Sequence, residues 1–165
     1  MASSRAILIE YASEQYAAIA LAHMEEVLNA PVSIHVPLAP LHCDTLIEWR
    51  GDWLPLFDLN TWSGLLKDEA KHFCTVISYQ PTQGASRHYG CLRSISFPNI
   101  VEVDDSAAAP LPSTQWKGFA KACFTMGKQT IPVLDLAALF ETPYKQNLSL
   151  SKSDIEKYIP EENLV

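Results

Sequence analysis

The stretch WLPLFDLN at Trp53–Asn60 occurs a second time, in altered form, as TIPVLDLA at Thr130–Ala137. The two stretches align without a gap, and a glycine precedes each of them, Gly51 in WRGDWLP and Gly127 in FTMGKQTIP. The matching positions are Pro55, Asp58 and Leu59 in the first copy and Pro132, Asp135 and Leu136 in the second. We interpret the repetition as a duplicated β unit that closes each half of the chain.

Both copies place an aspartate at the point where a buried strand is predicted to end. Asp58 and Asp135 each follow an apolar run and precede a segment that can become helical, LNTWSGLL and LAALF. A carboxylate in this position accepts N–H bonds from the first turn of a helix, so we predict that both aspartates are structural caps. We do not interpret them as a catalytic acid and base, because caps after separate strands have no reason to face each other.

The first copy belongs to a longer run, TLIEWRGDWLPLFDLN at Thr45–Asn60, whose pattern predicts a strand, a tight turn and a second strand. Arg50, Gly51 and Asp52 occupy the predicted turn. A proline in a buried strand is tolerated only where its missing N–H has no ladder partner. Pro55 is therefore predicted at a sheet edge or at a bulge.

The remaining segments predict a mainly β protein with short helices. Leu21–Asn29 is predicted as a short helix, because Leu21, Met24 and Leu28 recur at intervals of three and four. Phe119–Phe140 repeats the plan of a hairpin followed by a buried strand. The other predicted strands are a hairpin of Arg5–Tyr11 and Tyr16–Ala20, then Val32–Pro37, Phe73–Tyr79 and the run His88–Val103.

Two further segments are predicted to connect or to end these elements. Asp104–Gln115 is poor in bulky side chains and contains two prolines, so we expect a linker that crosses the surface between the halves. In the tail, Ser153 and Glu156 have the spacing of a capping box, and Pro160 ends the short helix that they predict.

Charge and cysteine spacing argue against several classes of function. The formal net charge is −7 and the basic residues are scattered singly, so nucleic acid is not an expected partner. The cysteines show neither C-x-x-C nor zinc-finger spacing, which predicts free thiols and no metal site. Apolar runs are too short for a signal sequence or a membrane helix. We therefore expect a cytoplasmic protein without membrane insertion.

The sequence also lacks the motifs G-x-G-x-x-G, G-x-x-x-x-G-K-[ST], H-E-x-x-H and G-x-S-x-G, so neither catalysis nor a cofactor is expected. One alternative stays open. The five histidines and four cysteines could fold together into a Cys–His pocket that binds or hydrolyses a small molecule. A deep polar pocket would favour this alternative, whereas an exposed apolar groove would favour a protein-binding role.

Three segments resemble the CheW-like domain family. Ala6–Pro40 resembles the family's opening, in which a hairpin is followed by a short helix bearing V-x-E-I and then by a strand. Leu46–Asn60 is similar to the family's N-x-R-G-x-x-x-P-x-x-D-L, and Phe124–Phe140 is similar to the C-terminal copy of that element. The resemblance covers residues 5–141, which we take as the domain, and leaves 142–165 as a tail with a short helix.

The resemblance implies two five-stranded β-barrel subdomains around a shared hydrophobic seam, and a scaffold role without catalysis or cofactor. CheW proteins couple the regulatory domain of a CheA-type histidine kinase to the cytoplasmic tips of methyl-accepting chemoreceptors. Relatives such as PilI and ChpC serve type IV pilus signalling. The resemblance fits a chemotaxis adaptor and a pilus adaptor equally.

The resemblance also implies an ion pair between Glu26 and Arg50 that ties the predicted short helix to the hairpin. Glu25 lies about 100° round that helix and is expected in solvent. We predict a partner-binding site at Met24, Glu26, Val27, Arg50 and Gly51, beside an apolar groove at the seam that accepts a helical hairpin of the receptor. The kinase domain is expected at a separate hydrophobic sheet edge.

Overall fold

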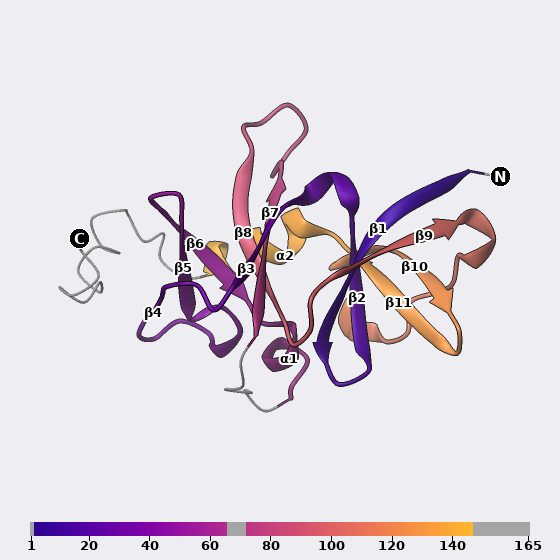
Figure 1. Ribbon diagram of the computed structural model, residues 1–165, viewed down its shortest axis with the longest axis horizontal. Helices are drawn as coiled ribbons and strands as arrows, with labels where there is room; N and C mark the ends of the chain where they lie inside the picture. Colours follow the sequence, from indigo (N-terminus) through magenta and orange to yellow (C-terminus); the bar gives the residue numbers. More distant parts are fainter. Residues whose placement is uncertain (1, 66–71, 147–165) are drawn as a thin grey trace.

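The computed structural model describes residues 2–65 and 72–146, with side chains described as far as residue 141. Within these ranges the protein consists mainly of β-strands in two curled sheets that lie beside each other (Figure 1). No helix in this part of the chain is long and apolar enough to cross a membrane. The helix predicted at Ser153–Pro160, and the rest of the tail beyond Gln146, lie outside the described residues.

Sheet A has five strands, and its members come from both ends of the described chain. They are β1 (Ser3–Ala12), β2 (Gln15–Ala20), β9 (Asn99–Asp104), β10 (Ala120–Met126) and β11 (Gln129–Leu134). Their order in the sheet is β10-β11-β2-β1-β9. The β1–β2 pair is the hairpin that the sequence predicted.

Sheet B has six strands within the described residues, all from the middle of the chain. They are β3 (Met24–Asn29), β4 (Ser33–His35), β5 (Thr45–Trp49), β6 (Asp52–Phe57), β7 (Phe73–Tyr79) and β8 (His88–Ser94). Their order is β3-β7-β8-β6-β5-β4. The polar loop between β7 and β8 projects from the top of the molecule in Figure 1.

Both sheets curl so that their outermost strands approach each other. In sheet A, Ala108 after β9 forms a β-bridge to Phe124 of β10. In sheet B, only residues 30–32 separate β3 from β4, the two outermost strands. The four Cα–Cα steps from the end of β3 to the start of β4 span at most about 14 Å, so the joined ends of these two strands must lie close together. The predicted two-subdomain β fold is confirmed, with a sixth short strand in sheet B among the described residues.

The sequence repeat predicts that the two sheets correspond to consecutive halves of the sequence, and this prediction is wrong. The chain begins in sheet A, forms all of sheet B, and returns to sheet A at β9. The predicted linker therefore does not cross between the halves. It joins β9 to β10 within sheet A, where the N–H of Ala109 donates to the carbonyl of Cys123 at 2.9 Å. Strand pairing between distant segments, β1 with β9 and β2 with β11, causes this arrangement.

The repeated sequence forms a repeated structural unit. β5–β6 and β10–β11 are antiparallel hairpins, and the second strand of each also pairs in parallel with another strand of its sheet. Each second strand leads into a helix, α1 (Leu59–Trp62) in the first copy and α2 (Leu136–Gln146) in the second. The interpretation of the repeat as architecture therefore agrees with the structure.

The predicted position of Pro55 at an edge or bulge is wrong. Pro55 lies opposite Leu46 in regular register, inside a strand that has neighbours on both sides. The parallel ladder between β6 and β8 is formed at Leu56 and Phe57, directly after the proline. The strand can therefore contain a residue without an N–H, because the second ladder begins only beyond it.

The helix predicted at Leu21–Asn29 is also wrong for most of its length. A single 3₁₀ turn, η1 (Leu21–His23), is followed by strand β3, which pairs with β7. Pairing with a buried strand of sheet B decides this conformation, because tertiary contacts override a weak helical periodicity. Side chains of this segment therefore alternate between two faces instead of sharing one side of a helix.

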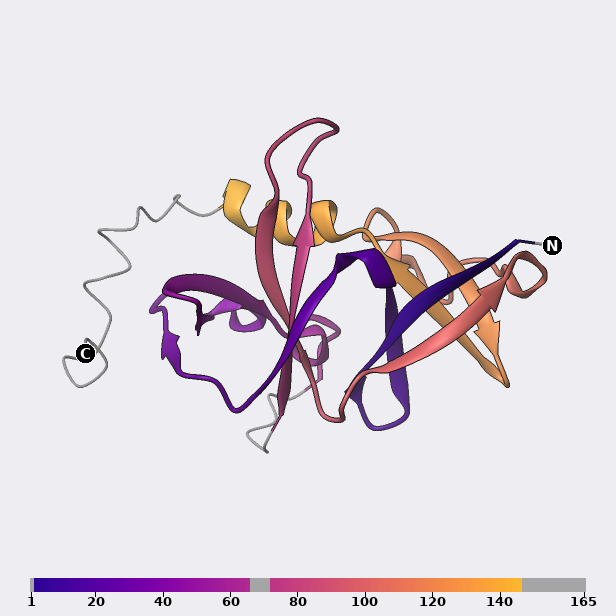
Figure 2. The same cartoon turned by 45° about the horizontal axis from the view of Figure 1, so that its top comes forward.

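The largest group of buried side chains lies between the two sheets, and it includes Ile9 and Ile19 from sheet A and Ile77 and Leu92 from sheet B. Helix α2 leaves the end of β11 and runs across the strands β7 and β8 (Figure 2), contributing Phe140 to the same core. Burial of this apolar surface holds the sheets together. Much of the predicted crevice between the halves is therefore filled.

Candidate functional site

A two-residue turn between β5 and β6 presents Arg50 and Gly51. Trp49 pairs with Asp52, and the two residues between them have positive φ angles of 50° and 84°. Both positive angles are required by the type I′ turn that matches the twist of a hairpin, and glycine adopts such an angle without strain. The N–H of Gly51 donates to the carboxylate of Glu48 at 3.0 Å.

Glu26 of β3 connects this turn to the edge of sheet B. Its carboxylate lies 3.7 Å from the guanidinium of Arg50, so the predicted ion pair is present. The shorter contact is one that the sequence did not reveal, because the Trp49 indole N–H donates to the same carboxylate at 2.6 Å. The Arg50 guanidinium also lies over the Trp49 ring, 4.6 Å from its centroid. Glu26, Trp49 and Arg50 therefore form one surface cluster.

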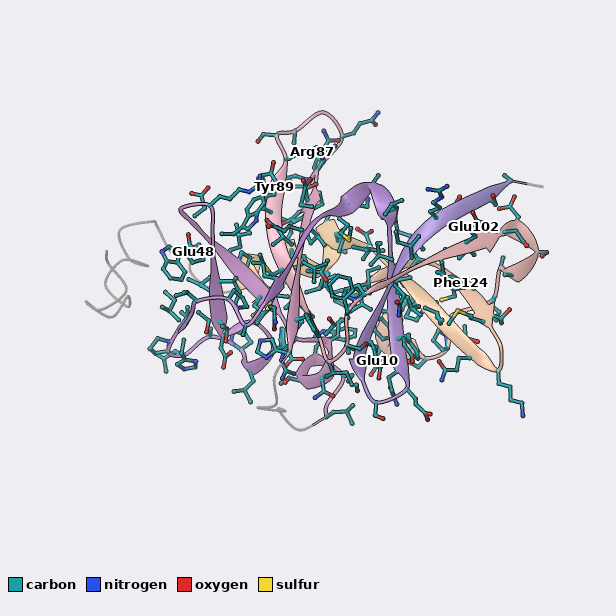
Figure 3. The ribbon with its side chains drawn as sticks, in the orientation of Figure 1. Glu10, Glu48, Arg87, Tyr89, Glu102 and Phe124 are labelled. Carbon is teal, nitrogen blue, oxygen red and sulfur yellow. The ribbon has the colours of Figure 1, made fainter. Side chains whose placement is uncertain are left out.

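Glu25 is exposed, as predicted, but it also forms contacts that a position on the solvated face of a helix would not have. Its carboxylate accepts a hydrogen bond from the Ser78 hydroxyl at 2.7 Å and lies 3.6 Å from the guanidinium of Arg87. Figure 3 shows Arg87 at the base of the β7–β8 loop, with Tyr89 further along β8. The difference follows from the strand conformation of β3, in which an interruption of the register lies between Met24 and Glu26.

The structure does not bring the five predicted partner-binding residues together on one face of β3. Leu28 packs with Trp49 against the core inside sheet B, so Glu26, two residues away, faces the same side. Val27 faces the opposite side, and Met24 packs against the core between the sheets. The structure therefore brings Glu26 together with the turn of Arg50 and Gly51, but not Met24 and Val27.

Four apolar side chains at the margin of the core between the sheets are partly or largely exposed, and we call them the seam strip. Phe73 shares a face of sheet B with Val27, and its ring meets that of Phe97 edge-on at 5.7 Å. Ile100 of β9 lies opposite Ile7, a member of the core between the sheets. The seam strip consists of Val27, Phe73, Phe97 and Ile100. The last two are 60% and 59% exposed, which is unusual for large apolar side chains and typical of a binding surface.

The two repeated aspartates occupy the beginnings of α1 and α2. Asp58 caps α1, where its carboxylate accepts the Asn60 N–H at 3.0 Å and lies 3.6 Å from the guanidinium of Arg93. Asp135 accepts the Ala138 N–H at 3.2 Å. Asp58 and Arg93 are almost fully buried, whereas Asp135 is half-buried. The two caps therefore occupy matching positions in the repeat, but they accept from N–H groups two and three residues further on and have different electrostatic surroundings.

The cysteines lack the features of nucleophiles. All four thiols are free and buried. Burial raises the pKa of Cys43 to about 11 and that of Cys74 to about 12, and it also raises the pKa values of Cys91 and Cys123. These thiols are protonated at neutral pH, and the thiolate is the reactive form. Neither the cavity beside His23 nor the cavity beside Tyr16 is lined by a cysteine. The arrangement gives no support to the Cys–His alternative.

Two substitutions of Glu26 are expected to lower the free energy of unfolding by small amounts, and comparing them separates the ion pair from the indole hydrogen bond. Glu26→Gln removes the charge opposite Arg50 but keeps an oxygen that accepts the Trp49 N–H, so we expect a loss of at most about 1 kcal/mol. Glu26→Ala also leaves the indole N–H without its acceptor, which adds about 0.5–1.5 kcal/mol. Urea denaturation followed by circular dichroism measures both. Equal losses would mean that the ion pair, and not the indole contact, stabilises the turn.

Comparison with known proteins identifies the family. Residues 5–143 match the CheW-like domain. The fold is similar to the crystal structure of the scaffolding protein TtCheW from Thermoanaerobacter tengcongensis, with a TM-score of 0.68 and 19% sequence identity over 85% of this chain and 94% of that chain. A search of curated proteins gave no significant match. Because the family match spans most of the sequence, this protein belongs to the CheW-like domain family, whose members are non-catalytic scaffolds.

Proposed function

We propose that the protein is a cytoplasmic adaptor that couples the regulatory domain of a CheA-type histidine kinase to the cytoplasmic tip of a methyl-accepting chemoreceptor, without a cofactor. The observation that carries this proposal is the seam strip, an apolar surface in a protein of a scaffold family. The output is chemotaxis or type IV pilus motility, since both systems use these classes of partner.

The seam strip is suited to a helical partner. A helix that carries apolar residues at positions i, i+3 and i+4 buries them against such a surface. Val27 lies within the strip, and Met24 lies beside it on β3. The cluster of Glu26, Arg50 and Gly51 lies on the other face of β3, which is the outermost strand of sheet B. A receptor hairpin supplies two helices, so it can contact both faces of this edge strand.

The kinase domain requires a second surface, which we assign to β4 and to the connection that follows it. β4 is an outermost strand of sheet B, and the connection from β4 to β5 exposes Leu38 completely and Leu41 by 64%. Leu38 has a φ of 66°, in the left-handed region that leucine rarely adopts. An exposed edge with adjacent apolar side chains favours pairing with another β domain.

Reciprocal substitutions test the two surfaces. Ile100→Glu places a charge in the seam strip and is expected to weaken binding to a candidate receptor tip at least about tenfold, or 1.4 kcal/mol, while leaving kinase binding intact. Leu38→Glu should show the opposite pattern. Arg50→Ala should weaken receptor binding by a smaller factor. Both replaced apolar residues are exposed, so the variants should fold, and circular dichroism checks this.

Isothermal titration calorimetry with each purified partner provides the measurement. Unchanged receptor binding in folded Ile100→Glu would contradict the proposal that the receptor binds the seam strip. Unchanged kinase binding in folded Leu38→Glu would remove that of the β4 edge. Each variant is the control for the other, because both introduce one negative charge at an exposed apolar position.

A further inference from the structure

A polar cavity of about 310 Å³ lies apart from both proposed partner surfaces. Its walls come from the β7–β8 hairpin of sheet B, from β10 of sheet A and from the first residues of α2. The polar residues that line it are His23, Ser78, Gln80, Gln83, Arg87 and Lys121. None of the described residues lining this cavity is acidic, although the protein as a whole carries a net charge of −7. The other lining residues are Tyr79, Leu136 and Ala137, so basic, neutral polar and apolar side chains line this space and no carboxylate of the described chain does.

Two of the basic side chains are held in place by Ser78. The Nδ1 atom of His23 lies 2.8 Å from the Ser78 carbonyl oxygen, so this nitrogen carries the proton and donates it. The Arg87 guanidinium donates to the Ser78 hydroxyl at 3.1 Å. Glu25 accepts from the same hydroxyl and does not line the cavity. Glu25 therefore fixes Arg87 and neutralises part of its charge without occupying the space.

The third basic side chain comes from the other sheet. Lys121 lies on β10 and is exposed, and within the described ranges of the chain it forms no ion pair. A guanidinium presents several donors in a fixed fork that matches carboxylate and phosphate oxygens, and an ammonium adds a point charge. Arg87 and Lys121 thus offer complementary contacts to one cavity from two different sheets.

We propose that this cavity binds a small anion that carries a phosphate or carboxylate group. The volume is at the lower end of the range for ligand sites and suits a ligand of a few heavy atoms. Arg87 and Lys121 are its principal contacts, and His23 supplies a further polar contact. A bound anion links the β7–β8 hairpin of sheet B to β10 of sheet A across the seam.

The test is a titration of the full-length protein with inorganic phosphate, pyrophosphate and succinate, at constant ionic strength set with sodium chloride. Isothermal titration calorimetry and amide chemical shifts in ¹⁵N-labelled protein report binding. We expect saturable binding of at least one anion, with a dissociation constant near or below about 1 mM. Preference for the phosphates over succinate identifies a phosphate ligand, and the reverse preference identifies a carboxylate.

Variants decide whether the cavity is the site. Arg87→Gln and Lys121→Gln should each weaken binding at least tenfold. Lys128→Gln is the matched control, because it removes the same charge at an exposed position in the turn between β10 and β11, outside the cavity lining. Absence of saturable binding overturns the proposal, and so does an equal loss in Lys128→Gln or no loss in the two folded cavity variants. None of these residues lies in the seam strip or the β4 edge, so this result is independent of the adaptor proposal.

Discussion

Asp58→Ala is expected to lower the free energy of unfolding by about 3–5 kcal/mol, whereas Asp135→Ala should lower it by only about 1 kcal/mol. Both substitutions remove the carboxylate that caps a helix after the repeated Pro-x-x-Asp-Leu element. The difference comes from Arg93. This side chain is 6% exposed and lies 3.6 Å from the Asp58 carboxylate, so Asp58→Ala removes a negative charge that faces a buried positive charge.

Urea denaturation followed by tryptophan fluorescence and circular dichroism measures both losses. The control is Arg93→Met, alone and combined with Asp58→Ala, because methionine keeps much of the apolar volume of arginine without its charge. We expect the double variant to be more stable than Asp58→Ala alone, since the buried positive charge that faced Asp58 is gone. Similar losses in Asp58→Ala and Asp135→Ala would show that the lost helix cap, and not the charge of Arg93, determines the loss of stability. A double variant less stable than Asp58→Ala would contradict a role for the buried charge.

The repeated element is the part of the fold that the sequence predicted best. Proline, aspartate and leucine recur at the same spacing in both copies, and each copy forms the second strand of a hairpin followed by a helix. The Glu26–Arg50 ion pair was also predictable, although only through the family resemblance. Local patterns of this kind are informative because the hairpin, the exit of the strand and the cap all lie within a few residues.

Contacts between distant segments could not be predicted in the same way. The pairing of β1 with β9 joins residues about 95 positions apart, and nothing in either strand specifies its partner. The Leu21–Asn29 segment carries a helical spacing of apolar residues, yet pairing with β7 makes most of it a strand. Because of this error the contact of Glu25 with Arg87 was not predicted, and Met24 and Val27 were placed beside Arg50.

The seam strip and the polar cavity likewise depend on contacts between segments that are distant in sequence. Phe97 and Ile100 follow β8 in sequence, but their exposure depends on how β9 returns to sheet A. Arg87 of the β7–β8 loop and Lys121 of β10 line the same cavity only because sheet B, sheet A and α2 pack together there. Sequence spacing therefore identified the scaffold, whereas the surfaces on which its proposed functions depend arise from the packing of the two sheets.

Gly90→Ala is expected to destabilise the protein by about 1–3 kcal/mol, against the usual direction for such a change in a strand. A glycine in a strand interior ordinarily costs about 0.5–1 kcal/mol relative to alanine, so the substitution alone should be favourable. At Gly90, however, an added Cβ would lie 2.5 Å from Cε1 and 2.9 Å from Cδ1 of Phe140. No carbon pair tolerates these distances, so the overlap exceeds the gain in backbone entropy.

Phe140 cannot move aside without further cost. Its ring is 1% exposed, stacks on Tyr79 at 5.7 Å and meets Phe57 edge-on at 5.8 Å, so any shift disturbs the contact of α2 with sheet B. Phe140→Leu should lose about 1–2 kcal/mol through the cavity it leaves. Because that cavity accommodates the new methyl group, Gly90→Ala combined with Phe140→Leu should be more stable than the sum of the single losses predicts. Chemical denaturation of the unmodified protein, the two single variants and the double variant measures the four stabilities of this double-mutant cycle. Additive losses would show that the two positions do not compete for the same space, and that the absence of a side chain at residue 90 has another cause.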